Sequence, residues 1–215
     1  VYKEAYDRKL IPDEVYREIR ALNWDFGNYF IAIWSKPNLK DPWGLKFEGH
    51  HISINLSVVG DKVSLTPLFL GTDPAEVSIT KYSGLRVLSK EEDYGLLLIN
   101  SLNEEQKQIA TLSQEVPGDI ITNPSNKQRI IEYQGIKASE LTTNQKDLLM
   151  KLLKEYINNL EHEKSHKYWS KIEESGIDEI YFAWIGSYER RKPNYYIINS
   201  PNFIIEYDNV GFNED

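Results

Sequence analysis

Two pairs of histidines carry the imidazole chemistry of this chain, which has four histidines and no cysteine. His162 and His166 stand one helical turn apart with Glu163 between them, and this matches the H-E-x-x-H pattern of zinc proteases. On one continuous helix, at about 100° per residue, both imidazoles would lie nearly opposite the apolar face that ends at Leu160. Because a catalytic zinc needs a walled site, we predict a chance match on a solvent-facing helix.

The other two histidines, His50 and His51, are adjacent and lead into an alternating strand. Neighbouring side chains of a strand point to opposite faces, so only a bend at Gly49 would let both imidazoles reach one cleft. His51 shares a face with Ser53 and Asn55, a polar row that suits a pocket or an ordinary polar face equally. His50 falls on the apolar face, where the simpler interpretation is a buried histidine bonded to backbone.

Two carboxylates near the end of the chain share one side of a predicted strand. Glu206 and Asp208 alternate with Ile205 and Tyr207. This spacing suits two catalytic carboxyl groups acting as acid and base, and it also suits metal ligands. Salt bridges to a neighbouring strand, or charges that protect a strand edge, would produce the same pattern.

Aromatic residues offer a different kind of site. They make up 12% of the chain, and this share suits either sheet surfaces or a ligand cleft. Trp43, Trp184 and Tyr196 could stack on a sugar, a peptide or another small molecule, with Asn55 supplying a polar contact. Stacking of this kind needs no titrating group.

These residues must be positioned by a mixture of helices and strands. Capping residues and apolar periods predict the helices, and β-branched or aromatic runs predict the strands. We expect a buried strand at 29–34, a loop at 36–44, and a hairpin turn at Gly60-Asp61. The fold class is therefore α+β, with an antiparallel or mixed sheet that includes a C-terminal meander and is packed by several helices. The expected helices cover 12–22, 89–101, 103–112 and 142–160, and the other expected strands cover 51–59, 62–65, 179–185, 195–198 and 203–207.

The charge and hydropathy of the chain argue against some classes of binding partner. The net charge is −8 without a long basic run, which argues against nucleic acid and anionic membrane surfaces. No apolar stretch approaches the roughly 20 residues of a membrane helix. We expect a soluble protein, either cytoplasmic or exported after removal of a signal, that binds a small-molecule ligand or substrate. The oligomeric state is not indicated.

Several segments, in order, resemble the uncharacterised domain-of-unknown-function family 3500 (DUF3500). The resemblance runs from about residue 29 to 209 and implies no established activity. Members of that family continue beyond the last strand into a His-x-His segment that this sequence lacks. We therefore predict one domain over 1–215, incomplete at its N-terminus and with a segment missing near 209–212. The matching segments are Trp43-Gly44, Phe47 to Asn55, Thr66 to Gly71, Pro74-Ala75, Phe182 to Gly186, Tyr195-Tyr196 and Ile205 to Asn209.

The resemblance implies a set of imidazole and carboxylate side chains that could serve as ligands of a metal ion. The first hypothesis is a metal-dependent enzyme, hydrolase-like or oxidative, in which a divalent metal is bound by His50, His51 and Glu206. Glu206 and Asp208 would then be its catalytic carboxylates. The alternative is a non-catalytic binding domain that uses the aromatic residues, and a purely structural domain is the third hypothesis.

Overall fold

The structure is a computed structural model that describes residues 1–22, 24–25, 27–125, 130 and 132–210. The chain divides into two compact units, Val1–Leu88 and Ser89–Asp215, and each is described by itself. Helices and strands occur in both units, which confirms the α+β class. None of the helices in the part of the chain that the structure covers is long and apolar enough to cross a membrane.

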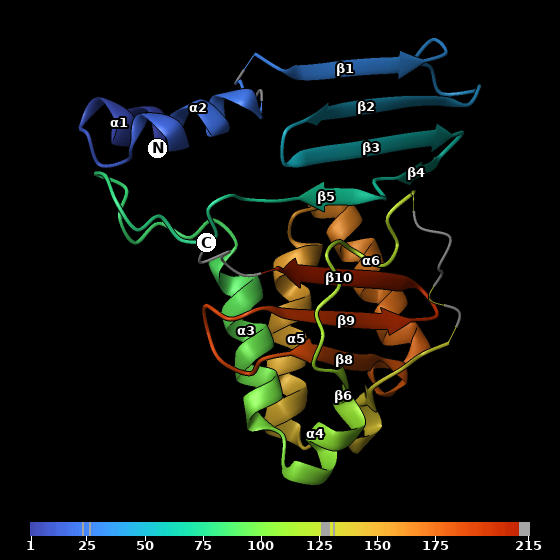
Figure 1. Cartoon of the computed structure of the whole chain (residues 1–215). Helices are drawn as coiled ribbons and strands as arrows, with labels where there is room; N and C mark the ends of the chain where they lie inside the picture. Colours follow the sequence, from blue (N-terminus) through green and yellow to red (C-terminus); the bar gives the residue numbers. More distant parts are fainter. Residues whose placement is uncertain (23, 26, 126–129, 131, 211–215) are drawn as a thin grey trace. The chain divides into compact units, whose positions relative to one another are not determined.

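The first unit combines two short helices with a five-stranded sheet whose pairings are all antiparallel (Figure 1). Strand β3 is its centre, because β2, β4 and β5 all pair with it. The elements are α1 (Tyr2–Asp7), α2 (Asp13–Ala21), β1 (Tyr29–Trp34), β2 (Trp43–Gly49), β3 (Ile52–Val59), β4 (Lys62–Ser64) and β5 (Leu68–Leu70).

The expected hairpin at Gly60-Asp61 is confirmed. Val59 pairs with Lys62, and Gly60 has a φ of 61°, a conformation that glycine adopts without a steric penalty. The expected loop at 36–44 ends earlier than predicted, because β2 begins at Trp43 and lies between two partner strands.

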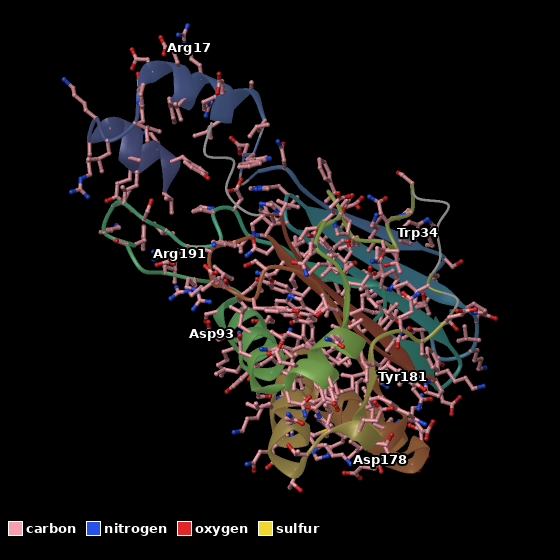
Figure 2. The ribbon with its side chains drawn as sticks, turned by 60° about the horizontal axis from the view of Figure 1, so that its bottom comes forward. Arg17, Trp34, Asp93, Asp178, Tyr181 and Arg191 are labelled. Carbon is pink, nitrogen blue, oxygen red and sulfur yellow. The ribbon has the colours of Figure 1, made fainter. Side chains whose placement is uncertain are left out.

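Strand β1 forms as predicted, but its expected burial is wrong. It is the outermost strand of its sheet, and all six of its side chains are exposed. Ile31 is 68% exposed, and Trp34 at the far end of the strand lies at the surface (Figure 2). An apolar run therefore identified a strand correctly, although it did not identify an interior one.

The second unit packs helices onto a five-stranded sheet with the order β10-β9-β8-β6. The C-terminal meander is confirmed, since β8, β9 and β10 pair antiparallel in sequence order, whereas β6 pairs parallel to β8. A further short strand, β7, also pairs with β8. The elements are α3 (Ser89–Ser101), α4 (Glu104–Ala110), β6 (Thr111–Ser113), β7 (Ile136–Lys137), α5 (Thr143–Ile157), α6 (His162–Ser175), β8 (Tyr181–Gly186), β9 (Asn194–Ser200) and β10 (Phe203–Asn209), with 3-10 turns at Ala138–Glu140 and Ile177–Glu179.

Strands β8 and β9 of the meander are buried on both faces. Helices α3 and α5 cover one face (Figure 1), where their leucines pack against Phe182, Trp184 and Tyr196. The opposite face presents Tyr195 and Ile197 to a smaller apolar cluster. That cluster is completed by Val116, Ile121 and Ile130, from the segment between β6 and β7.

Local capping explains where the long helices begin and end. The Thr142–Gln145 capping box is present as predicted, but α5 ends at Ile157. A new helix then starts at His162, with the side chain of Glu161 accepting hydrogen bonds from the backbone N–H groups of Glu163 and Lys164. The assumption of one continuous helix through residue 166 is therefore wrong.

Gly95 on α3 allows the close approach of helix and sheet. A Cβ atom at this position would lie 2.6 Å from Cε1 of Tyr196. The ring of Tyr196 is fully buried and stacks on Tyr207 at 4.9 Å, so it has no room to move away.

We therefore expect Gly95→Ala to destabilise the second unit by about 1–3 kcal/mol, because overpacking outweighs the gain of about 1 kcal/mol in helix propensity. Chemical denaturation followed by circular dichroism measures this difference. Gly118→Ala is the control, since a Cβ there meets no atom within 4 Å. A Gly95→Ala protein as stable as the wild type would contradict the packing described here.

Candidate functional site

The imidazoles of His50 and His51 lie together in the first unit. Because Gly49 pairs with Ile52, these two histidines are the whole turn between β2 and β3. His51 has a φ of 69°, which is uncommon for a residue with a side chain. The prediction that strand alternation separates the two side chains is therefore wrong. The turn brings the ring centroids to 4.2 Å from each other.

An aromatic neighbour covers this pair. The indole of Trp24 stacks on His50 with centroids 4.6 Å apart and planes 10° from parallel, and it lies 5.7 Å from the ring of His51. The Nε2 atoms of both histidines are enclosed, and neither has a hydrogen-bond partner among the residues that the structure describes. Enclosed ring nitrogens without partners are costly, so two in one place call for a physical explanation.

The backbone of the turn is held from two sides. The N–H of Gly71 donates to the carbonyl of His51 at 2.8 Å, and the hydroxyl of Tyr29 donates to the carbonyl of His50 at 3.3 Å. A Cβ at Gly71 would lie 3.0 Å from Nδ1 of His51, which is a tight contact that a small shift of the imidazole would have to relieve. The positions of the two histidines are thus held by hydrogen bonds of their main chain, and neither Nε2 atom takes part in them.

The surroundings favour a neutral imidazole at residue 51. Burial lowers the pKa of His51, the adjacent His50 lowers it further, and Asp73 opposes the shift. Asp73 also accepts a hydrogen bond from the hydroxyl of Tyr2 at 3.2 Å. A neutral imidazole keeps a lone pair that can bind a metal ion or accept a proton.

Two other predicted site residues of this unit make local contacts. The amide of Asn55 donates to the carbonyl of Pro67 at 2.8 Å and so connects β3 to the segment before β5. The indole N–H of Trp43 donates to the carbonyl of Asn38 at 2.9 Å and closes the loop before β2.

In the second unit, Glu206 binds the segment that covers the meander. It faces the same side of the sheet as Tyr195, and its carboxylate accepts hydrogen bonds from the N–H of Ile121 at 2.9 Å and from the N–H of Thr122 at 3.3 Å. The hydroxyls of Thr122 and Tyr195 also donate to it. Glu206 would first have to release these donors in order to bind a metal.

Asp208 lies on the same face, two residues further, and differs from Glu206. It is half-buried, and its Oδ1 is enclosed without a hydrogen-bond partner in the described part of the chain. Burial raises the pKa of Asp208 to about 6, and the negative charges of Asp119 and Glu206 add to the shift. Asp208 is therefore a carboxyl group whose protonation changes near pH 6.

The predicted aromatic residues of this unit belong to its core. Trp184 is 1% exposed and Tyr196 is fully buried. The indole N–H of Trp184 donates to the carbonyl of Ser187, and the hydroxyl of Tyr196 donates to the carbonyl of Glu91. These rings stack on their neighbours, so they leave no face for a ligand.

The zinc-protease pattern lies in the first turns of α6. His162 and His166 are both exposed, with ring centroids 4.6 Å apart, so the prediction that they face solvent is confirmed. Within residues 1–22, 24–25, 27–125, 130 and 132–210, no three His, Cys, Asp or Glu side chains form a group that could hold a metal ion. Residues 211 and 212 of the expected gap near 209–212 lie outside the described residues.

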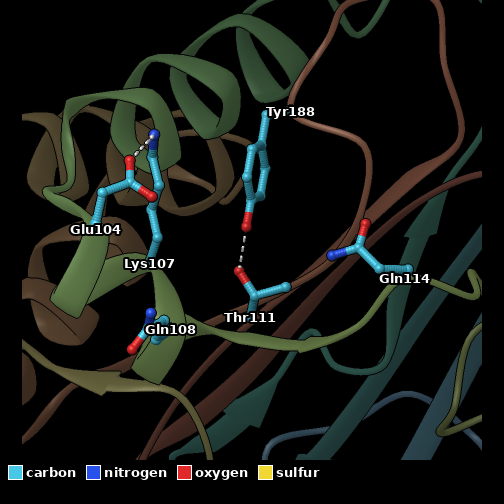
Figure 3. A pocket seen from close by; sticks show the side chains of 6 residues that line it. All are labelled: Glu104, Lys107, Gln108, Thr111, Gln114 and Tyr188. Carbon is cyan, nitrogen blue, oxygen red and sulfur yellow. Dashed lines mark hydrogen bonds and ion pairs between the residues drawn. The ribbon is translucent and has the colours of Figure 1, made fainter.

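Sequence reasoning missed two features. Trp24 lies between Leu22 and Phe26 in the sequence, and nothing in its spacing connects it with the histidines. A hollow beside α4 was also missed (Figure 3). Its side chains on α4 have the sequence pattern of an ordinary exposed helix, and its aromatic wall, Tyr188, comes from a distant loop.

A comparison with protein-family models matches residues 10–214 to the family described as "Protein of unknown function (DUF3500)". The comparison with curated proteins gave no match. The comparison with solved structures gave none either.

Replacing Glu206 tests its role as the anchor of the covering segment. We expect Glu206→Ala to destabilise the second unit by about 1–3 kcal/mol, because the N–H groups of Ile121 and Thr122 lose their acceptor. Limited proteolysis should then cut between residues 114 and 125 faster than in the wild type. Glu105→Ala, at an exposed position of α4, is the control. Unchanged cleavage would argue against the anchor.

The raised pKa of Asp208 predicts a pH-dependent stability. Since its folded pKa lies above the unfolded value of 3.8, this group costs stability as the pH rises from about 4 through about 6. Asp208→Asn should therefore be the more stable protein at pH 7, by about 1 kcal/mol because the carboxyl is only half-buried, and this advantage should vanish near pH 4. Denaturation at both pH values measures it, with the exposed Asp147→Asn as control for the lost charge. An advantage that is independent of pH would contradict the assignment.

Proposed function

Because the chain belongs to the DUF3500 family of proteins of unknown function, we propose a function from the site itself: a metal-dependent enzyme in which His50 and His51 bind a divalent metal ion. The observation that carries the proposal is the pair of enclosed Nε2 atoms without partners, on rings whose centroids are 4.2 Å apart. Imidazole nitrogen suits zinc, copper, nickel and iron.

The environment of the pair supports metal binding. The lowered pKa of His51 keeps its lone pair free of a proton at neutral pH. Stacking by Trp24 excludes water from one side of the rings, and a dry wall strengthens the interaction between a cation and its ligands. The negative charge of Asp73 interacts electrostatically with the imidazole of His51.

A metal bound by two imidazoles retains open positions for water or substrate, as hydrolytic and oxidative enzymes require. Asp208 and Glu206 belong to the second unit, so no step of the proposed metal chemistry is assigned to them.

The alternative, a binding domain with an aromatic cleft, is less well supported. It relied on Trp184 and Tyr196, and both rings are buried in the core. The amide of Asn55 is engaged with Pro67.

Metal binding is tested on the full chain by titration with Co²⁺, followed by its absorption, and by elemental analysis after dialysis against Zn²⁺. We expect about one metal per chain, and a loss of affinity of at least about tenfold in His51→Ala and in His50→Ala, since each removes one ligand.

The second histidine pair is the matched control. His162 and His166 are exposed and one helical turn apart, so they could hold a metal without forming a catalytic site. The variant with both replaced by alanine should bind metal as the wild type does. Equal metal content in His51→Ala and the wild type would refute the proposal. So would loss of metal only when His162 and His166 are replaced.

A further inference from the structure

A hollow in the second unit has the composition of a binding site. It lies beside α4 and the start of β6, where Tyr188 from the loop after β8 forms one wall (Figure 3). Its volume of about 550 Å³ is within the range of small-molecule sites. The lining residues are Glu104, Lys107, Gln108, Thr111, Gln114 and Tyr188.

The tyrosine ring in this wall is held firmly. The phenol oxygen of Tyr188 is 2.7 Å from the hydroxyl oxygen of Thr111, and the amide of Asn100 donates to the carbonyl of Tyr188 at 2.9 Å. The ring centroid also lies 6.5 Å from that of the buried Trp184. A ring fixed in this way loses little freedom when a ligand binds against it.

The charges of the hollow compensate each other. Nζ of Lys107 lies 3.6 Å from a carboxylate oxygen of Glu104 and 5.4 Å from the centroid of the Tyr188 ring. One cation and one anion leave the lining without net charge, so neither an anionic nor a cationic ligand is favoured.

The remaining polar groups are amides with free hydrogen-bonding capacity. Gln108 and Gln114 are exposed, and neither side chain has a hydrogen-bond partner among the described residues. Each amide offers two donors and an acceptor. Together with the Lys107–Glu104 pair, they can bind several hydroxyl groups at once.

We infer that this hollow binds a neutral sugar. The apolar C–H face of a pyranose would pack on the ring of Tyr188, while its hydroxyls would bond to the amides of Gln108 and Gln114. This site is separate from the histidine pair and does not depend on the proposed metal chemistry.

The test uses saturation-transfer NMR on the full chain with the methyl glycosides of glucose, mannose, galactose and N-acetylglucosamine. Each is supplied at about 1 mM, near the Kd expected for a ligand of this size in an open site. We expect transfer to the ring protons of at least one glycoside. Tyr188→Phe should retain it, because the ring remains, and Tyr188→Ala should weaken binding about tenfold.

A variant of the polar wall keeps the test independent of folding. Replacing the exposed Gln108 and Gln114 together by alanine should weaken binding about tenfold, whereas Gln134→Ala, an exposed amide outside the hollow, should leave it unchanged. Absence of transfer to every glycoside would overturn the inference. Undiminished transfer to a glycoside in the Gln108/Gln114 variant would overturn it as well. A neutral Gly-Ser peptide is added as competitor, and transfer to this peptide without transfer to any glycoside would also overturn the inference.

Discussion

The second unit depends on the alternation of side chains along β9. Tyr195 and Tyr196 are neighbours in sequence and point to opposite faces, yet both are fully buried. Each face of the meander therefore needs its own cover, which α3 and α5 provide on one side and the segment after β6 provides on the other. Burial raises the pKa of both phenols, so both hydroxyls stay protonated and donate hydrogen bonds.

The same alternation gives the carboxylates of β10 different roles. Glu206 and Asp208 share a face, and their register partners are Ile197 and Tyr195. Glu206 meets the N–H groups of the covering segment, whereas Asp208 lies among negative charges. Burial and the neighbouring negative charges make Asp208 bind its proton more tightly, whereas the carboxylate of Glu206 serves as the hydrogen-bond acceptor of the covering segment. Two identical functional groups on one strand thus come to differ in chemistry.

In the first unit, the tight turn between β2 and β3 is the determining constraint. A turn of two residues forces His50 and His51 to one end of the hairpin and places one of them at positive φ. Strain of this kind persists where the surroundings hold it, as Gly71 and Tyr29 do here. Enclosed nitrogens without partners and a positive φ at a residue with a side chain occur together at this turn, and this combination is the basis of the proposed metal site.

The sequence by itself determined most of the helices and several of the strands, and which side chains share a face. It did not indicate β5, β6 or β7, and it placed a loop where β2 begins. A run of β-branched and aromatic residues identified β1, alternating patterns identified β3 and β10, and the Thr142–Gln145 capping box identified the start of α5. These signals are local, because each depends on neighbours within about four residues. The placement of Glu206 and Asp208 on one side of β10 followed from the same alternation.

Only the tertiary structure decided what each face meets. It made a turn of His50 and His51, ended α5 at Ile157, and enclosed Trp184 in the core. It also joined Thr111 to Tyr188, which are 77 residues apart. A side chain's direction is set by its own backbone, but its partner comes from a distant part of the chain, and no local pattern encodes that partner.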